Sequence, residues 1–106
     1  MSGRRRESIM EKMKLYKKLY GDTITTTEKQ QEILTPEAIG RSGDILVNVV
    51  GFQIINEGKT NIEIQINGGN IVPIMSNTGI DMGSDSVTSC IVHTKGAKVT
   101  WMCKGW

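Results

Sequence analysis

The chain has 106 residues, enough for one domain, and 38% of them are hydrophobic, with a single Phe. A domain of this size buries roughly two-thirds of its unfolded surface, so the expected core is thin and aliphatic, and oligomerisation is a natural source of extra stability. No apolar run approaches the ~18–20 residues that cross a bilayer as a helix, and two cysteines are too few for a disulfide scaffold.

The net charge of +2 is distributed unevenly along the chain. Residues 1–20 hold seven Lys/Arg and two acids, whereas residues 21–106 hold six Lys/Arg and nine acids. A basic end on an acidic body indicates that this end has its own partner: nucleic acid, a membrane or the acidic surface of another subunit. Glu7, Glu11 and four lysines interrupt any signal peptide, so we expect a soluble intracellular protein or part of a particle assembled inside a cell.

Residues 1–21 are predicted to form a basic arm followed by an amphipathic helix. The arm contains three successive arginines: Arg4, Arg5 and Arg6. From about Glu7 to Tyr20, apolar side chains recur at steps of four, three and four residues, which places them on one helical face. This face consists of Ile9, Met13, Tyr16 and Tyr20, and it is widened by Met10, Leu15 and Leu19. Gly21 is the expected end of the helix.

A helix of ~14 residues is marginal in isolation, so its apolar face needs a surface to cover it. That surface is the protein's own β domain, a neighbouring copy or different protein, or a membrane, although the face lacks the Trp and Phe anchors of a membrane helix. Met and Tyr suit an interface, so we expect docking between subunits or on another protein. On this interpretation, removing residues 1–21 leaves the β domain folded and abolishes assembly.

Residues 22–43 are predicted to be a connector. A weak capping box predicts a short helix from Glu28 to Leu34, which Pro36 closes. Thr35 is the expected cap of one further turn. The segment Gly40-Arg41-Ser42-Gly43 is a flexible joint, and the β domain is expected to begin after it.

The β domain, residues 44–106, is organised around an alternating segment from Thr60 to Asn67. Ile62, Ile64 and Ile66 point to one face and polar side chains to the other, as in a strand with one buried face. Turn signals flank the segment at residues 56–59, where Gly58 is expected to need a positive φ, and at residues 67–70. These signals predict two successive hairpins, and therefore a meander.

Six or seven short strands are expected in this domain. They are Ile45–Val50, Phe52–Asn56, Thr60–Asn67, Ile71–Met75, a possible Gly79–Met82, Ser86–His93 and Lys98–Cys103. Gly51 marks a bulge or corner, and Pro73 places its strand at an edge or a bulge because proline lacks an N–H donor. Short strands with regular turn signals are typical of a small antiparallel β-sandwich or barrel. The predicted fold is therefore mainly β, preceded by the N-terminal helix and connector.

No pattern of residues indicates an enzyme, a cofactor or a metal site. His93, the single histidine, has no Cys or carboxylate at ligand spacing and is interpreted as a residue at a strand end. Asp81 and Asp85 do not match the spacing of an EF-hand loop and are interpreted as turn formers. We therefore expect no catalytic residue, no cofactor and no bound metal.

The two cysteines are placed on the arms of a final hairpin. If Lys95-Gly96 is the turn, Cys90 lies opposite Trp101, too far from Cys103 for a relaxed disulfide. If Gly96-Ala97 is the turn, the cysteines face each other and can form a disulfide. Reduced, half-buried cysteines are the favoured interpretation.

The two tryptophans are expected to have different roles. Strand alternation places Val99 and Trp101 on the core face. Trp106 is the last residue, and it either closes one end of the barrel or anchors on a neighbouring subunit. We therefore include Trp106 among the interface candidates.

The order of motifs in the second half of the chain resembles a class of virion proteins. The motifs are the segment Asn61-Ile62-Glu63-Ile64-Gln65-Ile66-Asn67-Gly68-Gly69, the strand with Val72-Pro73-Ile74, and the ending Ala97-Lys98-Val99-Thr100-Trp101. They resemble small β-sandwich structural proteins of tailed bacteriophages that infect Gram-positive hosts. The resemblance implies a head decoration, neck or tail-associated subunit present in many copies, and it transfers no catalytic residues.

The favoured functional hypothesis is a structural component of such a virion, assembling with copies of itself and with other virion proteins. A ligand- or carbohydrate-binding β-sandwich is the first alternative, but five aromatic residues supply poorly the row of exposed rings that it needs. Non-specific nucleic-acid binding through the basic arm is the second alternative, and we expect it to be weak at physiological salt. A membrane partner is not expected.

Overall fold

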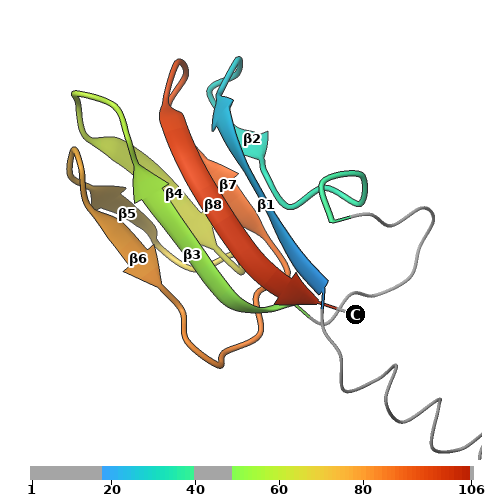
Figure 1. Ribbon diagram of the computed structural model, residues 1–106. Helices are drawn as coiled ribbons and strands as arrows, with labels where there is room; N and C mark the ends of the chain where they lie inside the picture. Colours follow the sequence, from blue (N-terminus) through green and yellow to red (C-terminus); the bar gives the residue numbers. More distant parts are fainter. Residues whose placement is uncertain (1–17, 40–48, 106) are drawn as a thin grey trace, which may run out of the picture.

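A computed structural model describes residues 18–39 and 49–105, and it contains eight strands and no helix in these ranges. The strands are β1 Lys18–Thr25, β2 Gln31–Glu32, β3 Val50–Asn56, β4 Ile62–Ile66, β5 Ile71–Ile74, β6 Gly79–Asp81, β7 Cys90–Val92 and β8 Lys98–Gly105. They form a first sheet with the order β1-β8-β3-β6 and a second sheet with the order β2-β7-β4-β5. The two sheets lie one behind the other, as the layers of a sandwich (Figure 1).

The connectivity of the strands is that of a jelly roll. All strand pairs are antiparallel, and among the described strands only β4 and β5 are both consecutive and in the same sheet. Every other connection crosses from one sheet to the other. Eight strands in two sheets with this order define the fold, which confirms the predicted antiparallel β-sandwich. The predicted meander is wrong, because β3 and β4 lie in different sheets.

β1 occupies the sequence that was predicted to end the amphipathic helix. Residues 18–20 are strand residues, and β1 pairs with β8 along its whole length, from Lys18 opposite Gly105 to Thr25 opposite Lys98. Residues 7–17 of the predicted helix lie outside the described residues. The helix prediction fails at its end because a step of four residues is even, so it also fits the period of two in a strand.

Tyr20, predicted as an interface residue on the helix, is half-buried in β1 and packs against the core, as does Ile24. Gly21 is a strand residue and not the end of a helix. A chain without residues 1–21 would lack half of β1. The expectation that the β domain survives this truncation is therefore not supported.

Residues 22–39, predicted as a connector, belong to the sandwich. β2 pairs with β7, and the core includes Ile33, Leu34 and Ile39. Glu32 accepts hydrogen bonds from the backbone N–H of Leu34 at 3.2 Å and of Cys90 at 2.8 Å. These bonds hold the segment against β7, so the helix predicted from Glu28 to Leu34 does not form.

The turn predicted after Pro36 is confirmed. The N–H of Ala38 donates to the Thr35 hydroxyl at 3.2 Å, and the N–H of Ile39 donates to the Thr35 carbonyl at 3.3 Å. Thr35 therefore caps one turn, as the sequence indicates. This turn delivers Ile39 to the core.

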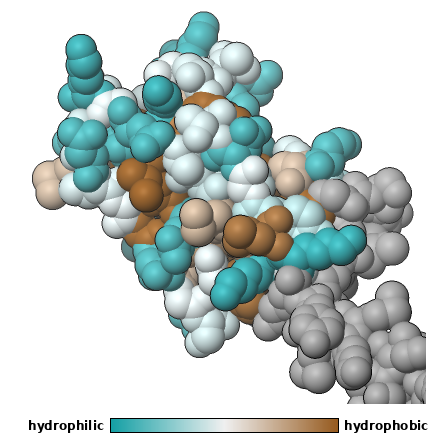
Figure 2. Space-filling model, in the orientation of Figure 1, coloured by the Kyte–Doolittle hydropathy of each residue, from teal (hydrophilic) through white to brown (hydrophobic). Residues whose placement is uncertain are grey.

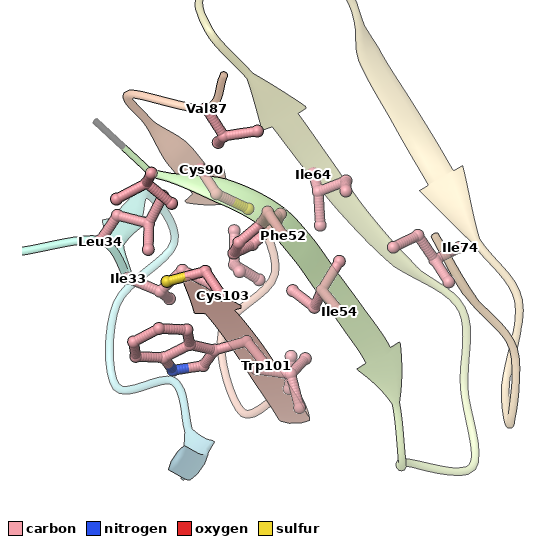
Figure 3. Packing of buried hydrophobic residues seen from close by; sticks show 14 of the residues in the cluster. Ile33, Leu34, Phe52, Ile54, Ile64, Ile74, Val87, Cys90, Trp101 and Cys103 are labelled. Atoms are coloured by element: carbon pink, nitrogen blue, oxygen red, sulfur yellow. The ribbon is translucent and has the colours of Figure 1, made fainter. Parts of the chain in front are cut away.

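Apolar side chains from both sheets fill the space between them (Figure 3). Phe52 of β3 and Trp101 of β8 are the largest, with ring centroids 6.5 Å apart. Aliphatic side chains surround this pair, as the composition predicts. Alternate residues of β8 face inwards, which confirms the core positions of Val99 and Trp101. The other fully buried residues include Ile54, Ile62, Ile64, Val87 and Val92.

β3 and β4 largely follow the predicted pattern. The bulge at Gly51 is confirmed by a φ of 64° and by a register shift between β3 and β8. Of the predicted strand Ile45–Val50, residues 45–48 lie outside the described residues. Ile62 and Ile64 are buried, and Ile66 is partly buried against the core.

The hairpin between β4 and β5 is also confirmed. Asn67 and Gly68 both have positive φ, and the N–H of Gly69 donates to the Ile66 carbonyl at 2.9 Å. Positive φ at both central residues defines a type I′ turn, whose twist suits a β-hairpin. β5, which contains Pro73, lies at a sheet edge as expected.

Asn56, at the end of β3, ties the two sheets together although its side chain is fully buried. Its amide nitrogen donates to the carbonyls of Thr60 at 2.8 Å and Ile74 at 3.1 Å, and its amide oxygen accepts from Gly58 at 3.0 Å. Ile74 belongs to the second sheet, so one side chain holds the crossing loop and both layers. Gly58 is not among the positive-φ residues, so this expectation is wrong.

We predict that Ile64→Asp unfolds the protein, because Ile64 of β4 is fully buried in the core and a buried carboxylate costs several kcal/mol. Denaturant unfolding followed by fluorescence measures the effect. Ile55→Asp is the matched control, since Ile55 is 43% exposed on β3. A folded Ile64→Asp variant as stable as this control would contradict the assigned face.

We also predict that Asn56→Ala lowers the free energy of unfolding by about 2–4 kcal/mol, since it removes the three hydrogen bonds of a fully buried side chain, including the one to the buried Ile74 carbonyl. Asn70→Ala, in the exposed β4–β5 turn, is the control and should change stability by no more than about 0.5 kcal/mol. Equal midpoints in urea for the two variants would show that Asn56 does not hold the sheets together.

Candidate interaction surface

Most predicted interface residues lie outside the described part of the chain. They are Arg4, Arg5, Arg6, Ile9, Met13, Tyr16 and Trp106. Tyr20 is the exception, and it lies in β1 at one edge of the first sheet. The described part of the candidate interface is therefore β1 itself, which the sequence did not predict as a strand.

β1 is the longest open edge among the described strands. It has eight residues and pairs only with β8. The other three edge strands are shorter: β2 has two residues, β6 has three and β5 has four including a proline. Short edge strands and prolines protect a sheet against pairing with another chain, and β1 lacks both protections.

The backbone of β1 alternates between bonding to β8 and facing the open edge. Thr26, just after β1, exchanges backbone hydrogen bonds with the turn before β8: its N–H donates to Ala97 at 2.9 Å and its carbonyl accepts from Gly96 at 2.9 Å. The backbone N–H and carbonyl groups of the even-numbered residues of β1 thus face β8. The backbone groups that face the edge belong to Leu19, Gly21, Thr23 and Thr25.

One of these edge groups has a partner in its own strand. The N–H of Thr23 donates to the carboxylate of Asp22 at 2.8 Å. Asp22 and Lys18 are the two charged residues of β1, and both are exposed. The strand therefore carries one positive and one negative side chain at even positions, on the inner side of the sheet edge.

The outer face of the first sheet has a shallow hollow beside this edge. It lies over Gly21 and is bordered by Leu19, Thr23, Thr100 and Met102. No side chain can fill it, because a Cβ on Gly21 would lie 2.6 Å from the Trp101 carbonyl oxygen. The close approach of β1 to β8 therefore requires glycine and leaves the surface concave there.

Exposed apolar side chains lie beside the hollow on this face. Leu19 is 68% exposed and Met102 is 40% exposed, and Ile55 projects from β3 on the same face. Figure 2 shows brown apolar surface in the middle of this face among polar residues. A second exposed apolar group, Ile71, Val72 and Met75, lies on and after β5 in the other sheet.

Polar contacts fix several side chains on the outer face of the first sheet. The hydroxyls of Thr23 and Thr100 lie 2.8 Å apart, and the Thr100 hydroxyl also bonds to the carboxylate of Glu57. Towards the β6 edge of the same sheet, the Gln53 amide donates to Asp81 at 3.3 Å. The polar side chains of the outer face are therefore held in fixed orientations by hydrogen bonds.

The described residues offer little for metal or acid–base chemistry. His93 bonds through Nε2 to the Gln65 side chain at 2.9 Å, and Asp81 accepts the N–H of Gly83 at 2.7 Å. Within residues 18–39 and 49–105, no group of three or more His, Cys, Asp or Glu could hold a metal ion. No described segment is a helix long and apolar enough to cross a membrane.

Cys90 and Cys103 are free and buried, on strands of opposite sheets. The hairpin on which both predicted geometries rested does not exist, because β7 and β8 do not pair. Burial, with a smaller contribution from the nearby Glu32 charge, raises the pKa of Cys90 to about 12, and burial raises the pKa of Cys103 to about 11. Both residues are therefore protonated apolar core groups at neutral pH.

Comparisons with known proteins assign no family. No protein-family model and no curated protein matches the chain. One solved structure, from Bacillus endospore appendages described as "a novel family of disulfide-linked pili", is similar with a TM-score of 0.46 and 10% sequence identity. The match covers 85% of this chain and 87% of that one, and a likeness of this size carries no functional argument.

We predict that native Cys90 and Cys103 resist alkylation at neutral pH and react only on unfolding. Because both native pKa values lie above the unfolded value of 9.0, the thiols contribute stability below pH 9.0 that is lost as the pH rises towards 11 and 12. Mass spectrometry after iodoacetamide treatment and urea unfolding at several pH values measure both effects. The Cys90→Ala/Cys103→Ala variant should lose less stability between pH 9 and 11, and an identical pH dependence would contradict the assignment.

Proposed function

We propose that this protein is a structural subunit that acts by assembling with copies of itself, and not by catalysis. The observation that carries the proposal is the position of its exposed apolar side chains. They form two groups on different sheets, one around Leu19 and Met102 and the other around Ile71 and Met75. Exposed apolar patches of this kind mark contact sites for other proteins.

The open edge of β1 supports the same proposal. An open strand edge presents N–H and carbonyl groups that another chain can pair with. It lies directly beside the first apolar group, since Leu19 belongs to β1 and Met102 is opposite Gly21 on β8. A subunit with one strand edge and two apolar groups has surfaces for more than one neighbour.

We further propose that the assembly is the virion of a tailed bacteriophage, with the protein as a head decoration, neck or tail-associated subunit. The motifs that carry the resemblance include the Asn67-Gly68 hairpin, the edge strand with Pro73 and the final strand with Trp101. Jelly rolls are used by viral capsid domains and by lectins, so the fold is compatible with this setting and does not select it.

We predict that the full-length protein exceeds its monomer mass in solution and that the excess grows with protein concentration. Light scattering after size-exclusion chromatography, repeated over a wide concentration range, gives the mass. Met75→Asp and Met102→Asp each place a charge in one apolar group and should reduce the mass. A monomer at every concentration would refute self-assembly as the function.

A further inference from the structure

We propose that two copies of the chain associate by pairing their β1 strands antiparallel, across a two-fold axis at Tyr20. This inference rests on the proposed self-assembly and specifies one contact within it. It joins the first sheets of both copies into one continuous sheet. Closed two-fold contacts, in which one surface meets itself, are the commonest in homo-oligomers.

The backbone of β1 supplies the hydrogen bonds for this pairing. Leu19 and Gly21 turn their N–H and carbonyl groups to the open edge, while the even-numbered residues bond to β8. In an antiparallel pair with its axis at Tyr20, Leu19 of one copy lies opposite Gly21 of the other. The outward backbone groups then meet one another on both sides of the axis, as in strand addition to a sheet edge.

The charges of β1 favour this register over the registers with the two-fold axis at Gly21 or Asp22. With the axis at Asp22, two like charges would face each other, which is destabilising. With the axis at Gly21, Asp22 would face Tyr20, and Lys18 would face Ile24. With the axis at Tyr20, Lys18 faces Asp22 of the second copy twice, so every charged side chain of β1 meets the opposite charge.

The surface beside the strand fits the same register. Leu19 is 68% exposed, and its side chain lies on the outer face of the sheet because it is next to Lys104 of β8. Opposite Gly21 of the second copy, it lies over the hollow that Gly21 leaves between Thr23 and Met102. Each copy thus places an exposed leucine on a concavity of the other that Met102 and two threonines border.

Asp22 can take part without breaking the contact it already makes. One of its carboxylate oxygens accepts the Thr23 N–H at 2.8 Å, and the other makes no hydrogen bond within the described residues. That second oxygen is available to Lys18 of the second copy. The bond to Thr23 orients the carboxylate along the strand edge in advance.

Charge reversal in the full-length protein tests the pairing. Lys18→Asp and Asp22→Lys each place like charges opposite one another at two symmetric positions, so each should weaken dimerisation roughly five- to tenfold. The double variant Lys18→Asp/Asp22→Lys restores opposite charges and should regain the wild-type dimer. Sedimentation velocity gives the dissociation constants, and the losses should shrink at high salt because the charges are exposed.

Two further variants test the leucine contact and the register. Leu19→Ala should weaken the dimer, because Leu19 is 68% exposed at the proposed contact, whereas Asn70→Ala, in the exposed β4–β5 turn, should leave it unchanged. Tyr20→Cys in a Cys90→Ala/Cys103→Ala background should form an intermolecular disulfide under mild oxidation, because residues on the axis have Cα atoms roughly 4.5–5.5 Å apart. Thr25→Cys in the same background lies off the axis and should not.

The outcomes separate this inference from the proposed function. If the wild type self-associates but the two reversals and the double variant bind equally well, the β1 pairing is wrong and self-assembly stands. If the double variant stays as weak as the single ones, the register is wrong. If the wild type is a monomer throughout, both the pairing and the proposed function are overturned.

Discussion

The antiparallel pairing of β1 with β8 is the constraint on which the rest of the structure depends. It joins residues from the two ends of the described chain and makes β8 a central strand between β1 and β3. As a central strand, β8 can place Val99, Trp101 and Cys103 in the core. The same pairing leaves the other edge of β1 open, so the bond that completes the sandwich also creates its main candidate interface.

Two buried polar residues hold the sheets in register near the C-terminal end of β1. Asn56 joins β3 to the loop that crosses to the second sheet, and Thr26 joins β1 to the turn before β8, where its hydroxyl donates to the Thr94 carbonyl and accepts the Ala97 N–H. Their polar atoms have hydrogen-bond partners, so burying these side chains does not destabilise the folded protein. Apolar packing alone would permit the layers to slide, whereas these bonds fix where each crossing loop begins.

The sequence predicted well those elements whose signals are local. The Ile62–Ile66 alternation, the Asn67-Gly68 turn, the Pro73 edge and the Gly51 bulge all follow from neighbouring residues. Strand partners depend on distant residues, which explains why a meander was expected where the chain crosses between sheets. β1 was missed because the spacing from Tyr16 to Tyr20 fits a helix and a strand equally, and its partner lies at the far end of the chain. Tyr20 and Leu19 were therefore predicted only as parts of a helical face, while the roles of Gly21 and Asp22 follow from the pairing of β1 with β8.

The sequence distance between β1 and β8 also has a consequence for how the chain folds. The β4–β5 hairpin closes over the four residues 67–70, whereas Lys18 meets Gly105 only after almost the whole described chain is in place. Loop closure costs more entropy as the loop lengthens, and folds with distant contacts form slowly. β1 is thus the strand best suited to dock late on a sandwich that the other strands have already assembled. Until it docks, the edge of β8 remains open, and the time spent in that state depends on the rate at which one end of the chain finds the other.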